Sequence, residues 1–572
     1  MRKAVVLAVA VAALALPATA WAHAYLVHTF PSASGTVNSS PKELQLTYDE
    51  AVEPKFAVIS VTDAAAHQET IGSPHRSPTS PETLVVTLKH LAEGWYLVYW
   101  RVISVDGHPV RSAFTFAVGP NPGPQPQFVI PSISETATTP QLLTTRWLTF
   151  ISLMAAIGLF VLRMLIARPL VRRVSGTQLR AVSIAFGIAV GAALLAIPLY
   201  VLFATAQFAL RSVFALGAIV PLVRVAAFGR AYLDLELVTA FFAVAAFVAI
   251  WVDKPEREHR SLAELFSLGG ALLAAGAALL VPGLGGHAAQ TAPRAWSLLF
   301  DWVHLVTGSL WIGGLVGLLV LWRALPAARR VAGLVVVVPR FSNVAFVSVN
   351  LLILSGTGAA IFHLPTLGSL WQTSYGQAIL WKVGLLCCAL LLASVNLLRT
   401  KPRLQASRNK PELGAPTATL LRRLVATEVV LVASAIFAAA VLSSLPPPAK
   451  ALAEAGNAAA RVGPGPVASV VQQNGYRIAL GVTPNKAAVP NAFTLTLTRN
   501  GKPVTGAQIT TTFAMLDMEM GQQEYTLPEV APGVYKRAAP ALVMVGHWGL
   551  GFQISPPGGQ PFQVLIVDRA GG

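Results

Sequence analysis

Cysteine is almost absent from this chain of 572 residues, and methionine is scarce. The only two cysteines, Cys387 and Cys388, are adjacent within an apolar run, so the chain has neither a disulfide framework nor a Cys-x-x-Cys redox motif. Of the seven methionines, none lies between Met164 and Met515. Because Cu(I) and similar ions prefer sulfur ligands, most of the chain lacks the soft donors that such ions need.

Charged residues are also few, at 12% of the chain, whereas hydrophobic residues make up 54%. This balance indicates a membrane protein, and the length exceeds that of a single domain. The net charge of +17 could suggest a nucleic-acid partner. Much of the positive charge, however, lies in short loops between apolar segments, and this distribution argues against nucleic acid.

Eight apolar runs are long enough to cross a bilayer, at about 20 residues each. They lie near 147–167, 181–206, 232–252, 262–282, 296–322, 342–362, 377–398 and 424–445. Lys and Arg gather in alternate loops, as the positive-inside rule requires if both ends of the chain are exported. The stretch 208–230 is apolar but interrupted by Arg and Pro, so we expect an interfacial or re-entrant segment there.

The first 22 residues have the pattern of a signal peptide. Arg2-Lys3 precedes an apolar stretch from Ala4 to Leu16, and Ala20-Trp21-Ala22 fits the cleavage rule. Cleavage after Ala22 makes His23 the first residue of the mature chain. Its free α-amine and its imidazole could then bind one metal ion together.

A second set of metal ligands lies downstream, at Asp106-Gly107-His108. In an extended segment the Asp106 and His108 side chains point to the same side. Nitrogen donors with one oxygen suit Cu(II), which heads the affinity order for such sites. We therefore predict a Cu(II) site at His23, Asp106 and His108. The alternative is that His108 only shapes a turn and that the signal peptide is cleaved elsewhere.

These residues belong to longer motifs with a family likeness. The segments 23–26, 31–35 and 100–110 resemble the CopC-type periplasmic copper-binding proteins, over about residues 23–119. The resemblance implies a small β-sandwich in which His23, Asp106 and His108 bind Cu(II). Some CopC proteins add a methionine-rich Cu(I) site, but residues 23–119 contain no methionine, so we expect a Cu(II) site alone.

The membrane region carries ionisable residues, which are costly in a bilayer and usually functional. Asp301 and His304 share one helix face because they are three residues apart. With two further histidines expected on the same outer side, they form a candidate copper path: His287, Asp301, His304 and His363. The alternative is that these groups cap helix ends or reach the interface. We expect Lys382 to neutralise a carboxylate.

Motifs around these residues resemble the CopD family of copper-resistance membrane proteins, over about 146–446. They include Asp301-Trp302-Val303-His304, Trp311-Ile312-Gly313-Gly314 and Ser355-Gly356-Thr357-Gly358. A CopC-like domain joined to a CopD-like domain resembles the fusion proteins of the YcnJ type. The resemblance implies copper handling at the membrane, and we expect uptake.

Residues 467–572 alternate apolar and polar side chains, with a hairpin signal at Asn500-Gly501, and predict a second β-sandwich of about seven strands. Its candidate Cu(I) ligands are Met518, Met520, Met544 and His547. The alternative for the methionines is core packing, which we expect for Met515. The stretch Phe513–Gly521 and its neighbours resemble the YtkA-like or FixH-like periplasmic β-domain.

The sequence thus predicts a multi-domain membrane protein with an exported β-sandwich, an eight-helix bundle and a second exported β-sandwich. The predicted parts are a signal peptide (1–22), a Cu(II)-binding domain (23–119), a Pro-rich linker (120–145), the transmembrane domain (146–446), a linker (447–466) and the C-terminal domain (467–572).

We expect a non-enzymatic copper transporter of the bacterial cytoplasmic membrane, with copper ion, the lipid bilayer and periplasmic copper chaperones as partners. The alternatives are sequestration without transport and a membrane redox enzyme.

Overall fold

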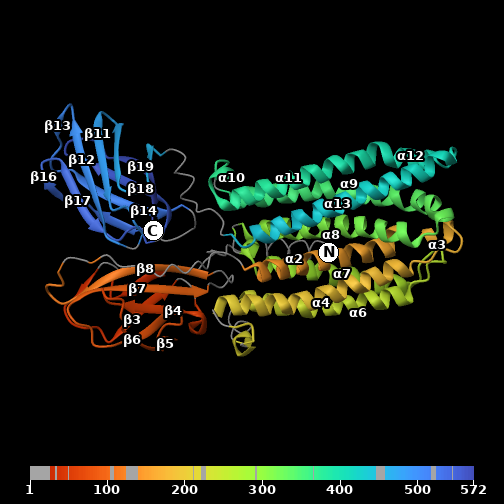
Figure 1. Ribbon diagram of the computed structural model, residues 1–572, viewed down its shortest axis with the longest axis horizontal. Coiled ribbons are helices and arrows are strands. Elements are labelled where there is room, and N and C mark those ends of the chain that lie inside the picture. Colours follow the sequence, from red (N-terminus) through yellow and green to blue (C-terminus); the bar gives the residue numbers. More distant parts are fainter. Residues whose placement is uncertain are drawn as a thin grey trace, which may run out of the picture.

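The computed structural model has three parts, with two β-domains at one end of a long helical bundle (Figure 1). It describes residues 26–571 except 33–34, 49–50, 104–108, 124–125, 127–138, 210–211, 215, 221–226, 290, 292, 365, 446–457, 488, 517–522 and 544. The predicted signal peptide lies outside the described residues. The fold class predicted from the sequence is confirmed.

The first part is a β-sandwich of two four-stranded sheets. One sheet has the strand order β1 (Leu26–Phe30), β3 (Glu43–Tyr48), β6 (Thr83–Leu88), β5 (Thr70–Arg76). The other has the order β2 (Thr36–Val37), β8 (Pro109–Val118), β7 (Gly94–Ile103), β4 (Val58–Thr62). Alternate residues of β3 are buried, and they meet Trp100 and Phe116 of the facing sheet in one core.

In the middle part, the described residues form eight helices long and apolar enough to cross a membrane, as the sequence predicts. They are α2 (Pro140–Val161), α4 (Arg180–Ala209), α6 (Ala227–Val252), α7 (Leu262–Leu284), α8 (Arg294–Ala324), α9 (Ala327–His363), α11 (Ser374–Val395) and α13 (Gly414–Leu442). Short helices α3 (Leu170–Arg173), α10 (Ser369–Gln372) and α12 (Lys401–Ala406) lie in the connections.

Helix α9 begins well before the apolar run that predicts it. Its first turns carry exposed Arg329, while Leu334 and Val337 on another face are buried against the bundle. The predicted run leaves out this stretch because Arg329, Arg330, Pro339 and Arg340 interrupt its apolar residues. Of the predicted interfacial segment 208–230, the described residues form the end of α4, the short turn Leu216–Ala218 and the start of α6.

The third part is a second β-sandwich. One sheet has the order β10 (Val467–Gln473), β11 (Tyr476–Thr483), β12 (Asn491–Arg499), β17 (Val534–Ala539), β16 (Glu529–Ala531), with β13 (Lys502–Pro503) on β12. The other has the order β15 (Gln523–Thr526), β14 (Gln508–Met515), β18 (Gly546–Ser555), β19 (Phe562–Ala570), β9 (Ala460–Arg461).

The C-terminal domain has more strands than the seven predicted, because short edge pieces such as β9, β13 and β16 leave little periodicity to read. The predicted hairpin is present. Asn500 and Gly501 both have positive φ, at 51° and 76°, and connect β12 to β13. Two such residues in sequence are typical of the tight turn that matches strand twist.

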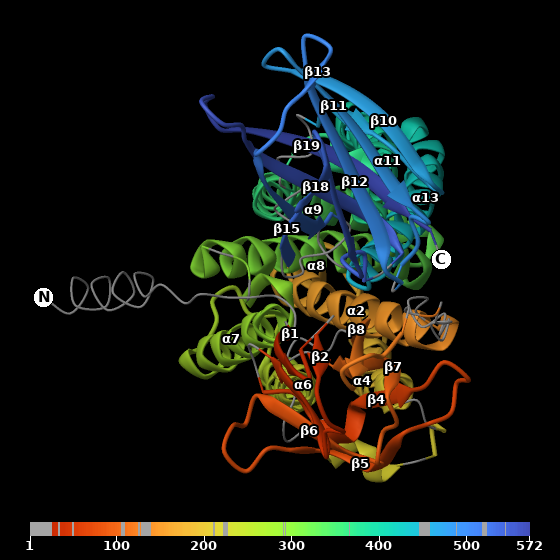
Figure 2. The same ribbon diagram turned by 90° about the vertical axis from the view of Figure 1, so that its left-hand side faces the viewer.

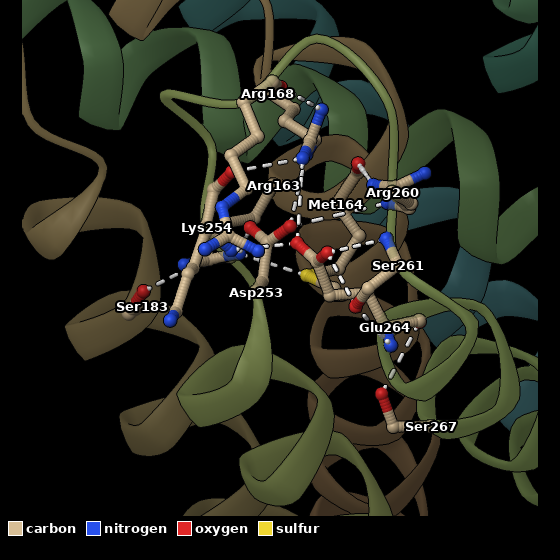
Figure 3. A network of polar contacts seen from close by, with 11 residues as sticks. Arg163, Met164, Arg168, Ser183, Asp253, Lys254, Arg260, Ser261, Glu264 and Ser267 are labelled. Carbon is tan, nitrogen blue, oxygen red and sulfur yellow. Dashed lines mark hydrogen bonds and ion pairs between the residues drawn. The ribbon is translucent and has the colours of Figure 1, made fainter.

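At the end of the bundle away from the β-domains, a buried ion-pair cluster joins α2 and its continuation to α6 and α7 (Figure 3). Asp253 accepts from Arg163 at 2.6 Å and from Arg168 at 2.9 Å, and Arg168 also reaches Glu264 at 3.5 Å. Glu264 closes a capping box with Ser261 at the start of α7. The cluster fixes three helices at one point.

We predict that Asp253→Ala lowers the thermal unfolding midpoint strongly, since it leaves two buried guanidinium groups without their carboxylate. Removal of one partner from a buried pair costs about 3–5 kcal/mol. The matched control is Arg172→Ala, which breaks an exposed pair with Glu258 of 3.6 Å and should cost about 0–1 kcal/mol. Equal midpoints for the two purified variants would contradict this role of the cluster.

Candidate functional site

Polar side chains from three helices meet inside the bundle and form what we call the polar seam: Asp301 and His304 of α8, Ser355 of α9 and Lys382 of α11. Lys382 Nζ lies 3.3 Å from His304 Nε2, and His304 Nδ1 lies 3.3 Å from Ser355 Oγ. A lysine ammonium can only donate, so Nε2 accepts and Nδ1 donates to Ser355. Ser355 in turn donates to the Leu351 carbonyl at 2.7 Å.

Small residues make room for this arrangement. A Cβ on Gly356 would lie 3.1 Å from His304 Cε1, and a Cβ on Gly283 would lie 2.7 Å from Asp301 Oδ2. Glycine at these positions lets α9 and α7 approach α8 closely without displacing His304 or Asp301. Among the described residues Lys382 forms no ion pair with a carboxylate within 4 Å, and its polar contact is with His304. That Lys382 neutralises a carboxylate therefore stays a prediction.

His363 has other neighbours. Its Nδ1 donates to the Ala359 carbonyl at 2.7 Å, and its Nε2 accepts from Thr291 Oγ1 at 3.2 Å. Its ring stacks on Tyr375, with 6.5 Å between the centroids. His287 is the first residue of a short helical turn that ends at Ala289. Among the residues that the structure describes, no three His, Cys, Asp or Glu side chains group closely enough to hold a metal ion.

The predicted Cu(II) ligands His23, Asp106 and His108 lie outside the described residues. The structure does describe the two strands that flank Asp106 and His108 in the sequence. Strand β7 ends at Ile103, and Ile103 pairs with Pro109 at the start of β8. This site therefore stays a prediction from the sequence.

The first β-domain lies in front of the part of the bundle that contains α2, α4 and α6 (Figure 2), and an apolar contact near the end of β7 holds it there. Phe56 and Ile103, which are 3% and 4% exposed, pack with Leu142 of α2 and Tyr200 of α4 in one cluster. Arg101 Nη2 also donates to the Gln207 carbonyl at 3.4 Å. The domain is thus docked on the bundle rather than joined to it by a linker alone.

In the C-terminal domain, Met515 is 2% exposed and belongs to the core, as expected. Met518, Met520 and Met544 lie outside the described residues. His547 lies on β18, opposite Arg569 of β19. Burial raises the pKa of the nearby Asp568 carboxyl. Hydrogen bonds from Asn485 and the Arg569 backbone and the charge of His547 act in the opposite direction and lower this pKa.

Sequence reasoning overlooked Ser355, the hydrogen-bond partner of His304. The signal was present, because Ser355 belongs to the Ser-Gly-Thr-Gly motif that carries the CopD resemblance. It also overlooked Asn396, which donates a hydrogen bond to the buried Glu428 from the neighbouring helix. A single polar residue in an apolar run gives no indication of its partner.

Comparison with known proteins assigns a family model to each of the three parts. The CopC domain matches residues 26–119, copper resistance protein D matches residues 335–442, and the YtkA-like family matches residues 471–551. The copper resistance protein D match includes α9, α11 and α13, which supply Ser355, Lys382 and Glu428.

Three relatives illustrate the likeness. The copper transport protein CutJ of Bacillus subtilis (strain 168) is 26% identical over 93% of both chains. Protein YobA of Escherichia coli (strain K12) is 32% identical over 20% of this chain and 90% of its own. Among solved structures, CopC from Methylosinus trichosporium OB3b is 33% identical and covers 18% of this chain and 99% of its own, with a TM-score of 0.17.

The fold and the polar seam define a multi-pass membrane protein that carries two β-sandwich domains at one end of its bundle. With the three family models in one chain, and a similarity to CutJ along nearly its whole length, the chain belongs to the CopC–CopD fusion family of copper transport and resistance proteins, here with a C-terminal YtkA-like domain.

We predict that Phe56→Ala loosens the docked domain, because Phe56 packs on the bundle and not in the core of its own sandwich. Amide hydrogen exchange should rise at the end of α4 around Tyr200. Ile71→Ala, at a position 52% exposed, serves as the control and should leave exchange there unchanged. Unchanged exchange in both variants would show that the contact does not hold the domain.

Proposed function

We propose that this protein captures Cu(II) outside the bacterial cytoplasmic membrane and passes copper inward along the polar seam. His23, Asp106 and His108 are the proposed Cu(II) ligands, and both β-domains are proposed to lie on the outer side. The observation that carries the proposal is the seam itself. Ionisable groups from α8 and α11 contact each other within the bundle, and a membrane anchor has no need of such costly groups.

Docking of the first domain supports delivery over a short distance. The domain contacts the bundle through the end at which β7 and β8 meet, and the proposed ligands Asp106 and His108 come between these strands in sequence. A docked donor needs no diffusion to meet its acceptor, because the two parts stay in one geometry. Periplasmic copper chaperones are proposed to load the domain from outside.

The second exported domain is proposed as a Cu(I) site, with Met518, Met520, Met544 and His547 as ligands. Thioether sulfur suits Cu(I), and the segment 515–520 carries three of the seven methionines of the chain. The two cysteines are exposed on the surface of α11, away from these ligands in the sequence.

A second candidate function is copper sequestration without transport. It is favoured by the position of Lys382, whose charge beside His304 opposes a metal cation at the same nitrogen. In that case the bundle would anchor the two binding domains. Copper accumulation in cells and in vesicles distinguishes the two functions.

We predict that one extra residue before His23 weakens Cu(II) binding by about 10- to 100-fold, because it removes the free α-amine from the site. Competition titration of the full chain with a Cu(II) chelator measures this. His67→Ala is the control, since His67 is an exposed histidine paired with Asp63 at 3.0 Å. Equal affinities in the extended and control proteins would rule out the N-terminal ligand.

We predict that the double variant His304→Ala, Asp301→Ala abolishes copper-dependent accumulation but leaves membrane insertion and Cu(II) binding by the first domain intact. The control is His259→Ala, at an exposed position in a loop outside the helices. Accumulation at the wild-type level in the double variant would make the seam structural and would favour sequestration.

A further inference from the structure

An open-sided cavity of about 220 Å³ lies between α8, α9, α11 and α13, and Phe346 and Asn350 of its lining are exposed. The first residue of α8 that lines the cavity is Trp311, seven positions after His304. Seven residues span about 10 Å along a helix, so the cavity lies farther from the β-domains than His304 does. Most of the lining is apolar. The polar members of the lining are Ser342, Asn350, Ser394, Asn396 and Glu428.

Glu428 is the only charged side chain among the described residues that line this cavity, and it is 2% exposed. Asn396 Nδ2 donates to Glu428 Oε1, while Asn396 Oδ1 is buried without a hydrogen-bond partner among the described residues. Asn396 also begins a π-helical turn, Asn396–Thr400. Such turns interrupt a helix and frequently mark functional positions.

Three basic side chains on the neighbouring elements are engaged elsewhere. Arg422 of α13 stacks on Trp322, with its guanidinium carbon 4.5 Å from the ring centroid. Arg340 of α9 donates to the Val336 carbonyl at 3.1 Å, and Lys401 of α12 donates to Asn343 at 3.0 Å. No ion pair of the described residues includes Glu428. A carboxylate buried in this way needs a proton or another cation.

We infer that this cavity is a cation site, in which Glu428 and Asn396 hold a small hard monovalent cation, either a proton or Na⁺. Carboxylate and amide oxygens are hard donors, and the described lining contains no sulfur or imidazole that would favour Cu(I). The cation binds to and leaves Glu428 while copper moves along the polar seam. The gradient of this cation across the membrane therefore drives copper transport. This coupling rests on the proposed transport function, whereas the cation site itself does not.

The first test uses the copper-free full-length protein in lipid vesicles and a hydrophobic carbodiimide, which modifies protonated carboxyl groups in apolar surroundings. Peptide mass spectrometry should find Glu428 modified, less so as the pH is raised. Na⁺ at constant pH should reduce modification if Na⁺ occupies the site, and no effect of Na⁺ assigns the site to the proton. Modification of Glu428 that changes with neither pH nor Na⁺ would overturn the cation site. The absence of any modification would also overturn it, as expected if a lipid chain fills the cavity.

The second test compares Glu428→Gln with Glu412→Gln in vesicles that carry an imposed gradient of the same cation. Glu428→Gln keeps the shape of the side chain and an oxygen that can accept the hydrogen bond from Asn396, but it removes the negative charge. Glu412 is an exposed control outside the cavity. The gradient should change copper uptake by about tenfold in the wild type and in Glu412→Gln, and this response should be lost in Glu428→Gln.

The two tests separate the failures. Cation-sensitive modification of Glu428 without any copper uptake by the wild type would contradict the proposed transport function and leave the cation site standing. Copper uptake that responds to the gradient equally in wild type and Glu428→Gln would overturn the coupling.

Discussion

In the low dielectric of a bilayer, an ionisable group must find a partner, and the structure of this bundle depends on that constraint. Each main set of buried polar residues joins helices that are distant in sequence. Asp253 brings two arginines of the first membrane segment to α6, His304 brings α11 to α8, and Glu428 brings α11 to α13. Apolar packing alone would leave the relative position of these helices weakly defined, because lipid tails solvate them as well as other helices do.

The same constraint separates a fully paired set of buried polar residues from two sets that are less completely paired. The cluster around Asp253 has opposite charges at ion-pair distance and a capping box, so it holds the bundle at one end. The polar seam and the cavity at Glu428 are less completely paired. His304 meets a lysine and a serine, and Glu428 meets only an amide. Groups with incomplete pairing can exchange partners, and the proposed ion path would require such an exchange.

Both domains lie at one end of the bundle (Figure 1), and the first is docked through Phe56 and Ile103. Both β-domains thus lie at the same end of the path proposed for copper. The proposed route therefore needs no large movement of the first domain.

The sequence by itself determined the three-part organisation, because long apolar runs, alternating strands and short motifs are local patterns that need no tertiary information. It also singled out His304, Asp301 and Lys382, since ionisable residues are conspicuous in apolar helices. Only the tertiary structure decided their partners. That His304 meets Ser355 and Lys382, that Asn396 meets Glu428, and that Phe56 docks on α4 depends on how helices far apart in sequence pack, and sequence spacing carries no record of that packing.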